Sequence, residues 1–223
     1  MFSIFANWKS HKNLVSTRAW VNTFLDAVDI TFSQAILEGR IELVLFPPAP
    51  LLYPLKLLVA DHEIAIGAQD ISSLPEGKYT GQVSAESLSD IATHVILGHV
   101  EERQLGDTQD IVQTKFARAL SGRITPLVCI TSPDQIITES PYIVYEPTAA
   151  VGTGNAASMT DITSFKSSCH LSSTQKFIYG GSVSPDNIEE FMKDDVVDGV
   201  LVGTDSLEPL VFAQLVNQVL SHA

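Results

Sequence analysis

The chain has 223 residues, of which 45% are hydrophobic and 17% are charged, a balance typical of a globular protein that can bury a large core. Twenty-six acidic residues against 13 basic ones give a formal net charge of −13 at pH 7. A field of this sign repels nucleic acid and anionic membranes, and no apolar run approaches the roughly 18 residues of a membrane span. We therefore expect neither a nucleic-acid partner nor a membrane.

The cysteine and histidine content bounds the chemistry further. Cys129 and Cys169 form no CxxC pair and no disulfide framework, which favours a reducing compartment, and the N-terminal segment lacks the basic region of a signal peptide. We therefore expect a cytoplasmic protein. The six histidines form no HxH or HxxxH pair, and no carboxylate cluster indicates a metal site, so we expect no metal and no cofactor.

Short apolar runs recur along the whole chain and predict eight buried strands. They cover residues 2–6, 41–46, 64–67, 94–97, 126–130, 142–146, 177–180 and 198–202. Helical spacing lies between most of them, as at 17–37, 50–60, 108–120, 185–193 and 206–221. Because strands that alternate with helices build parallel sheets, and no linker divides the chain, we predict one (β/α)8 barrel domain over residues 1–223. A doubly wound open sheet is the alternative on pattern alone.

Two connections depart from the regular alternation. The segment from Gly67 to Ser84 is too long for an ordinary turn between a strand and a helix, so we predict a functional loop there. The stretch from Ile130 to Pro141 is too short for a full outer helix. We therefore expect the helix after the fifth strand to be shortened or absent.

Chemically active residues follow several of the predicted strands. Asn7 and Lys9 follow the first strand, His99 the fourth and Glu146 the sixth, with glycine clusters after the last three. The C-terminal ends of the strands are where barrel enzymes place their active sites. Each residue alone has an ordinary structural explanation, but their coincidence at strand ends predicts a catalytic site.

Five short strings in chain order carry a resemblance to a known family. They are Asn7-Trp8-Lys9, the string from Ile96 to Arg103, Tyr145-Glu146-Pro147 with Gly152-Thr153-Gly154, the string from Tyr179 to Val183, and the string from Asp198 to Gly203. Together they resemble triosephosphate isomerase, a TIM barrel that interconverts dihydroxyacetone phosphate and D-glyceraldehyde 3-phosphate through an enediolate without a cofactor. The chain would be a short, divergent member.

The resemblance implies a role for each catalytic residue. Glu146 would be the base that moves a proton between adjacent carbons, and His99, as a neutral imidazole at a helix N-terminus, would be the electrophile. Lys9 would supply positive charge and Asn7 would orient the substrate. Glu101 would hold Lys9 in place by charge pairing.

The resemblance also implies a phosphate grip and a lid. The grip would consist of backbone N–H donors and a hydroxyl at Gly152, Gly181, Ser182, Gly203 and Thr204. The run from Pro147 to Ala157 resembles the lid that closes over the substrate. The hydroxyls of Tyr179 and Ser182 would latch it, meeting backbone near Ala157 and Gly154.

Several positions depart from the family pattern. Ala149 stands where the lid usually has a tryptophan, and Asn155 where a lysine is common, so we expect a lid that closes less firmly. Thr204 and Asp205 replace a second glycine and its neighbour, and a carboxylate there would compete with phosphate and cap the helix start itself, which predicts a raised KM.

The long loop of residues 69–82 resembles the one that inserts into a partner subunit, which implies a homodimer, with a tetramer possible. Gln82 and Glu102 replace the family's usual ion pair, and a hydrogen bond between them would take its place. Two other functions remain open. The chain could be another phosphate-binding barrel enzyme, or a catalytically weakened barrel that serves as a phosphate-ligand binding or scaffold protein.

Overall fold

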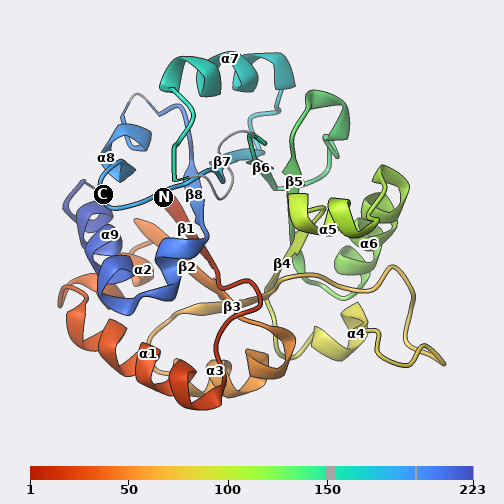
Figure 1. Cartoon of the computed structure of the whole chain (residues 1–223), viewed down its shortest axis with the longest axis horizontal. Coiled ribbons are helices and arrows are strands. Elements are labelled where there is room, and N and C mark those ends of the chain that lie inside the picture. Colours follow the sequence, from red (N-terminus) through yellow and green to blue (C-terminus); the bar gives the residue numbers. More distant parts are fainter. Residues whose placement is uncertain (149–153, 194, 223) are drawn as a thin grey trace.

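Eight parallel strands close into a barrel in the computed structural model, which describes residues 1–148, 154–193 and 195–222 (Figure 1). Each strand pairs with its neighbours in chain order, and β1 pairs with both β2 and β8. The strands are β1 (Phe2–Asn7), β2 (Ile41–Phe46), β3 (Ala65–Ala68), β4 (His94–Leu97), β5 (Thr125–Ile130), β6 (Tyr142–Tyr145), β7 (Lys176–Tyr179) and β8 (Gly199–Val202). The predicted closed barrel is thus confirmed and the open sheet is wrong.

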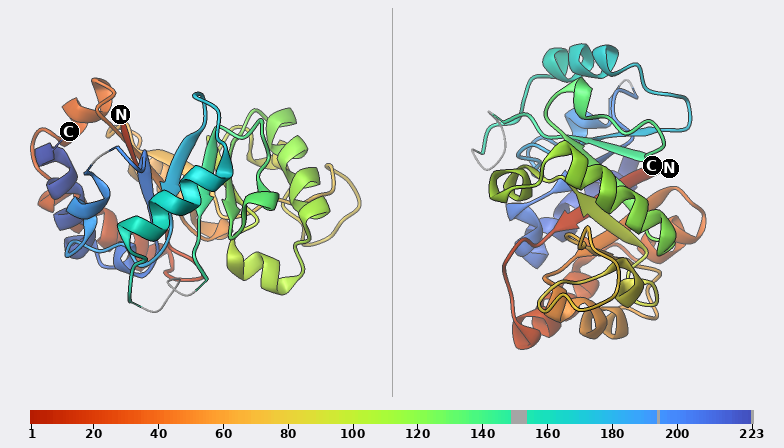
Figure 2. Two further views of the ribbon diagram at one scale, coloured as in Figure 1. Left: turned by 90° about the horizontal axis from the view of Figure 1, so that it is seen from above. Right: turned by 90° about the vertical axis from the view of Figure 1, so that its right-hand side faces the viewer.

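An outer ring of helices covers the barrel (Figures 1 and 2). The α-helices are α1 (Leu14–Ala27), α2 (Phe32–Leu37), α3 (Leu52–Leu58), α4 (Ala85–Leu88), α5 (Val100–Leu105), α6 (Gln109–Ser121), α7 (Met159–Cys169), α8 (Ile188–Phe191) and α9 (Pro209–His222). Short 3-10 helices are η1 (Ala49–Leu51), η2 (Pro133–Gln135) and η3 (Thr204–Leu207). Only η2 lies between β5 and β6, so the predicted loss of that outer helix is confirmed.

Two predicted helices differ from the structure. The segment 17–37 forms α1 and α2 with a break between them, where the Asp29 carboxylate accepts hydrogen bonds from the backbone and hydroxyl of Thr31 and builds a turn. The segment 185–193 forms only the single-turn helix α8, because the side chain of Asn187 bonds the backbone of Ser184 and Ser182 and stabilises a turn ahead of it.

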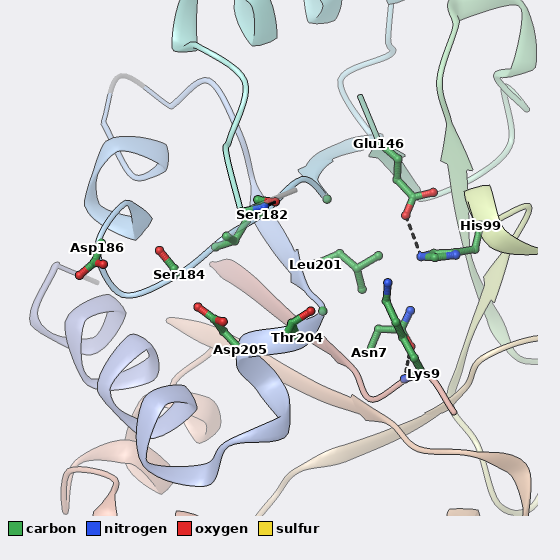
Figure 3. Close-up of a pocket in the computed structure, with 14 residues that line it drawn as sticks. Asn7, Lys9, His99, Glu146, Ser182, Ser184, Asp186, Leu201, Thr204 and Asp205 are labelled. Atoms are coloured by element: carbon green, nitrogen blue, oxygen red, sulfur yellow. Dashed lines mark hydrogen bonds and ion pairs between the residues drawn. The ribbon is translucent and has the colours of Figure 1, made fainter. Parts of the chain in front are cut away.

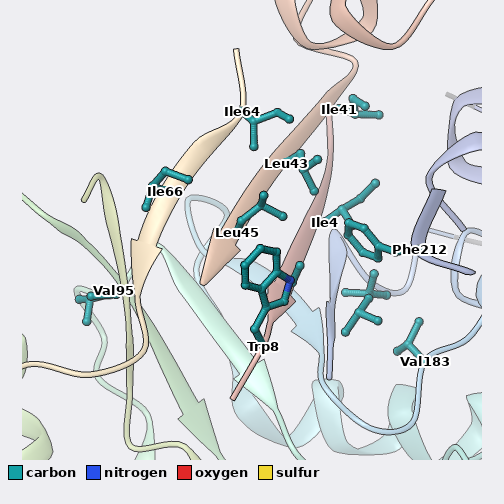
Figure 4. Packing of buried hydrophobic residues seen from close by; sticks show 14 of the residues in the cluster. Ile4, Trp8, Ile41, Leu43, Leu45, Ile64, Ile66, Val95, Val183 and Phe212 are labelled. Carbon is teal, nitrogen blue, oxygen red and sulfur yellow. The ribbon is translucent and has the colours of Figure 1, made fainter. Parts of the chain in front are cut away.

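Alternation along each strand divides the core into two parts. Phe5 of β1 and Val44 of β2 point into the barrel, where they pack with Ile96, Leu127 and other interior residues. Their sequence neighbours point outward against the helices, and Figure 4 shows Leu43, Leu45 and Ile66 in this outer layer beside Trp8. Because successive strand residues face opposite sides, both layers are hydrophobic and the strands read as continuous apolar runs.

The long segment after β3 projects from the ring of helices (Figure 1). It runs from Gln69 to Ser84 before α4 begins, as the turn residues predicted. Figure 2 shows the same projection from above. Leu74 and Tyr79 are 38% and 42% exposed on it, and Leu105 at the end of α5 is 82% exposed.

Candidate active site

A cavity of about 460 Å3 opens at the carboxyl ends of the strands. It brings together most of the residues predicted from the sequence: Asn7, Lys9, His99, Glu146, Ser182, Gly203 and Thr204 (Figure 3). Gly180 and Ser182 line it on either side of the predicted Gly181. Glu101 contacts Lys9 of the cavity, and Tyr179 contacts Ala157 of the predicted lid segment. Gly152 and Ala149 lie outside the described residues.

Glu146 is a buried carboxylate with both oxygens engaged. It follows β6 directly, and its backbone N–H donates to the carbonyl of Ile130, which fixes it at the barrel mouth. Its Oε1 lies 3.0 Å from Nε2 of His99, and its Oε2 accepts the backbone N–H of Val100 at 2.9 Å. The side chain is only 2% exposed. A desolvated carboxylate held in this way is suited to accept a proton from a bound substrate.

His99 caps the N-terminus of α5. Its Nδ1 accepts the backbone N–H of Glu101 at 3.2 Å, so that nitrogen carries a lone pair and the proton of the neutral ring sits on Nε2, facing Glu146. Burial opposes the charged imidazolium, but the hydrogen bond and charge of Glu146, with the charge of Glu101, outweigh burial and raise the pKa of His99. The backbone N–H of Glu101 thus selects the neutral tautomer with its proton on Nε2. Glu146, by raising the pKa, makes the imidazole of His99 easier to protonate than an ordinary histidine.

Lys9 adopts a backbone conformation that is unusual for a residue with a side chain. Its φ is 49°, and such left-handed residues store on the order of 1–3 kcal/mol of strain. The side chain of Asn7 accepts the Lys9 N–H at 3.0 Å, and the side-chain amide of Gln69 donates to the Lys9 carbonyl at 2.8 Å. These two hydrogen bonds therefore stabilise the left-handed backbone conformation of Lys9.

The ammonium of Lys9 is paired with Glu101. Lys9 Nζ and Glu101 Oε1 are 2.7 Å apart, which is the pairing that the sequence predicted. Burial opposes ionisation of Glu101, yet Lys9 and then His99 lower the pKa of its carboxyl. The ion pair therefore connects the cation to the segment that also carries the imidazole.

Gly98 and Arg103 fix the end of β4, next to His99. Gly98 has a φ of 66°, and a β-carbon there would lie 2.8 Å from Arg103 Nη2. Arg103 Nε donates to the Gly98 carbonyl at 2.8 Å, and its Nη2 donates to the Cys129 carbonyl at 3.2 Å on β5. These bonds set the direction in which His99 leaves the strand.

The described end of the lid segment is bound to the barrel at two points. The Tyr179 hydroxyl accepts the N–H of Ala157 at 2.7 Å, and the Ser182 hydroxyl accepts the N–H of Gly154 at 3.1 Å. Both are contacts that the resemblance implied. Ser182 has a φ of 53°, a second residue with left-handed backbone at the cavity. Gly154 also lines the cavity, so the two bonds hold this end of the segment at the edge of the cavity.

One detail of the predicted site differs from the structure, and a second stays untested. Gly203, not Asp205, is the N-cap of η3, and Asp205 makes no hydrogen bond to a backbone N–H in the described part of the chain, so the predicted capping by Asp205 is wrong. Gln82 accepts a hydrogen bond from the hydroxyl of Ser72 in its own loop at 2.9 Å. Glu102 of the same chain lies near the carboxylates of Asp70 and Asp107, and the hydrogen bond between Gln82 and Glu102 of two subunits stays a prediction.

Sequence reasoning missed several residues of the site. Ser184, Asp186 and Leu201 also line the cavity. The one signal for them in the sequence was their closeness to the ends of the last two strands. The buried thiol of Cys129 lies beside Glu146, and burial, followed by the charge and hydrogen bond of Glu146, raises the pKa of this thiol well above its ordinary value. The sequence could have indicated Cys129 only through its place in the fifth strand, where alternate residues point into the barrel.

A carboxylate cluster that the sequence did not predict lies near the projecting loop. Oxygens of Asp70, Glu102 and Asp107 lie within 4.8 Å of one another. Lys115 Nζ reaches Asp70 at 2.7 Å and Asp107 at 2.8 Å, so its ammonium neutralises part of the cluster. Burial raises the pKa of Asp70 to about 6 despite Lys115, and the charge of Asp107 acts in the same direction. The same pairing raises the pKa of Lys115.

The fold and the cavity together define a class of protein. A closed barrel that presents a buried carboxylate, an imidazole and an ammonium at the C-terminal ends of its strands is a barrel enzyme that moves protons with side chains. No helix in the described residues is long and apolar enough to cross a membrane.

Comparison with known proteins specifies the family. The family model described as triosephosphate isomerase matches residues 2–140 and 134–219. A triosephosphate isomerase of Dictyoglomus thermophilum is 31% identical over 250 aligned positions, covering 96% of this chain and 98% of the relative. Those of Aquifex aeolicus and Thermus thermophilus are 30% and 31% identical, covering 96% and 95% of this chain and 97% and 96% of the relatives. The chain belongs to the triosephosphate isomerase family.

Proposed function

We propose that this chain interconverts dihydroxyacetone phosphate and D-glyceraldehyde 3-phosphate with Glu146 as the base. The observation that carries the proposal is the 3.0 Å contact between Glu146 and the imidazole of His99, both buried at the cavity. Family membership supports the same reaction and a triose phosphate as the substrate. Only side chains are needed, since the proton leaves one carbon and returns to its neighbour.

The reaction divides between the two buried groups. Glu146 takes a proton from one carbon, and the electron pair moves to the carbonyl oxygen to form an enediolate. The Nε2–H of His99, which faces Glu146 in this structure, turns to the two substrate oxygens in sequence. Glu146 then returns its proton to the adjacent carbon. Lys9 and Asn7 orient the substrate and stabilise the negative oxygen.

The phosphate lies between Ser182 and Gly203 in this proposal. Because Gly181 and Gly203 have no side chains, a phosphate could approach their backbone N–H groups, and Thr204 and Gly152 would complete the grip that the resemblance implies. The helices that follow, η3 and α8, are single turns, so the backbone N–H groups rather than long helix dipoles supply the binding. The latch of Tyr179 and Ser182 excludes water while the enediolate exists.

Isomerisation by the purified protein, measured in a coupled assay, tests the proposal. The Glu146→Gln variant is the control, because it keeps the shape of the side chain and one accepting oxygen but removes the base. Loss of at least a thousandfold in kcat with little change in KM supports the assignment. An equally active variant would remove Glu146 from the role of base, and a folded wild type without activity would remove the isomerase function.

We also propose that the chain forms one domain over residues 1–223 and works in the cytoplasm as a homodimer through loop 69–82. The exposed apolar side chains of Leu74, Tyr79 and Leu105 around that loop support self-association. A tetramer is possible, since only η2 covers the barrel between β5 and β6. Sedimentation of the wild type and of Tyr79→Glu tests the interface, with dissociation of the variant as the expected result.

A further inference from the structure

The loop after β1 and the helix η3 lie next to each other at the cavity. β1 and β8 are neighbouring strands, with Ala6 paired to Val202, so the segments that follow them leave the barrel side by side. The first segment carries Lys9, and the second carries Gly203 and Thr204 of the proposed phosphate grip (Figure 3). The distance between the cation and the grip therefore depends on how these two segments are held together.

Ser206 binds η3 to the end of β1 and to α1. Its Oγ donates to the carbonyl of Gly203 at 2.7 Å and lies 3.4 Å from the carbonyl of Asn7. The indole N–H of Trp20 on α1 donates to the carbonyl of Ser206 at 3.1 Å. Ser206 is fully buried, so these bonds form away from water. They fix the first part of η3 against its two neighbours.

Lys12, from the loop after β1, holds the last residue of η3. Its Nζ donates to the carbonyl of Leu207 at 2.7 Å. The same ammonium lies 5.2 Å from the centre of the Trp8 ring and 5.9 Å from that of Trp20. An ammonium is attracted to the face of an indole ring, and the charge of Glu208 beside it also favours the cation. The half-buried side chain of Lys12 is thus held at a defined place.

The backbone of this loop needs support from outside the loop. The φ of Lys12 is 75° and that of Lys9 is 49°, and both lie in the left-handed region that residues with side chains seldom adopt. Such conformations persist only where the surrounding structure holds them. The bond from Lys12 to Leu207 joins residues 195 positions apart in the chain, so it connects the loop to η3 directly.

We propose that Lys12 is a positioning residue for the substrate phosphate, whose ammonium holds η3 so that the backbone of Gly203 and Thr204 keeps a fixed distance from Lys9. A β-carbon at Gly203 would lie 3.5 Å from Cε of Lys9, so the two segments pack closely where the grip begins. A shift of η3 would change the space that the phosphate enters. The inference rests on the proposed position of the phosphate between Ser182 and Gly203.

The contacts of Lys9 predict that KM and kcat respond differently to the loss of Lys12. The side chains of Asn7 and Gln69 hold the backbone of Lys9, and the carboxylate of Glu101 holds its ammonium, all independently of η3. We therefore expect Lys12→Met to raise KM about five- to tenfold and to change kcat less than twofold. One hydrogen bond from a charged donor is worth roughly a tenfold change in an equilibrium constant.

The kinetic test compares the wild type with three variants. Lys12→Arg keeps a charged donor and should restore most of the lost affinity. Lys166→Met is the matched control, because Lys166 Nζ also donates to a backbone carbonyl, that of Val196 at 2.7 Å, and lies 5.7 Å from the centre of the Phe177 ring. Val196 precedes β8, whereas η3 follows it, so we expect the control to keep the wild-type KM.

Two kinetic results would overturn the inference. One is a KM in Lys12→Met that is unchanged, or raised no more than in Lys166→Met. The other is a fall in kcat at constant KM. If the methionine variant does not fold, Lys12→Gln takes its place, since its shorter neutral side chain loses the charge and should raise KM in the same direction.

A binding measurement separates this inference from the isomerase proposal. Calorimetric titration with glycerol 3-phosphate, which has no carbonyl to isomerise, reports the phosphate grip without turnover. We expect Kd to be about five- to tenfold larger in Lys12→Met and unchanged in Lys166→Met. Equal binding by the wild type and Lys12→Met overturns the inference while isomerase activity stands. Weaker binding by Lys12→Met, in a protein whose wild type binds the ligand without isomerase activity, would contradict only the proposed function.

Discussion

Replacing Lys115 by methionine tests whether its ammonium stabilises the acidic cluster beside the projecting loop. The Lys115 side chain is 7% exposed and bonds both oxygens of Asp70, at 2.9 and 2.7 Å, and one oxygen of Asp107 at 2.8 Å. Methionine keeps the length and removes the charge. Because removing one partner of a buried ion pair leaves an uncompensated charge, we expect Lys115→Met to lose about 3–5 kcal/mol of unfolding free energy at pH 7.5.

The loss should depend on pH with a definite sign. The folded-state pKa of Asp70, about 6, lies above its ordinary value of 3.8. Its protonated form therefore favours folding, and this contribution is complete below about pH 4 and lost as pH rises through 6. Without Lys115 the carboxyls of the cluster protonate more readily. The variant should thus lose less stability at pH 5 than at pH 7.5.

Urea unfolding at one fixed protein concentration is the assay, because association changes apparent stability. With a denaturant slope of about 3 kcal/mol/M, at the upper end for small proteins, the midpoint should fall by roughly 1–2 M. Lys56→Met is the matched control, since Lys56 is exposed and donates to the carbonyl of Asp90. A loss below about 1 kcal/mol in Lys115→Met, or an equal loss at both pH values, would refute the reasoning.

Three further predictions concern single hydrogen bonds and carboxylates. Tyr179→Phe removes the bond to Ala157, worth about 1 kcal/mol, so kcat/KM should fall roughly fivefold. A less firmly held lid should also let more of the enediolate lose its phosphate by elimination, so the share of methylglyoxal, the elimination product, should rise; an unchanged share would contradict the latch. Burial of Glu42 opposes its charge, but hydrogen bonds from the side chains around it lower its pKa to about 2. Glu42→Gln should therefore lose about 3 kcal/mol of unfolding free energy above pH 4.5 and match the wild type near pH 2 in unfolding experiments. Glu146→Gln should lower the pKa of His99 in an NMR titration, because burial remains and the opposing carboxylate is gone.

The barrel could be predicted from the sequence because each strand is buried on both faces. Residues of β2 such as Val44 and Leu45 face the interior and the helices respectively, so the strand appears as an unbroken apolar run. The boundaries of helices were harder to predict. The break between α1 and α2 depends on the Asp29 turn, whose backbone bonds compete with the helical pattern and are not visible in hydrophobic spacing.

The residues that meet at the cavity could be predicted because parallel strands bring their ends to one side of the barrel. Asn7, His99 and Glu146 follow three different strands and therefore meet at one cavity. The cluster around Lys115 could not be predicted in the same way. Its acids come from the end of β3 and from two places around α5, and their distances depend on how that short helix packs.

Asp205 marks the limit between these two cases. Its position after β8 predicted that its carboxylate would compete with phosphate and would cap the following helix. In the structure Gly203 is the N-cap of η3, so the capping role could not be predicted from position alone. Asp186 lines the same cavity from the loop after β7, and its charge favours protonation of Asp205. The group that changes the environment of Asp205 thus comes from the loop after another strand, which spacing along the chain does not show.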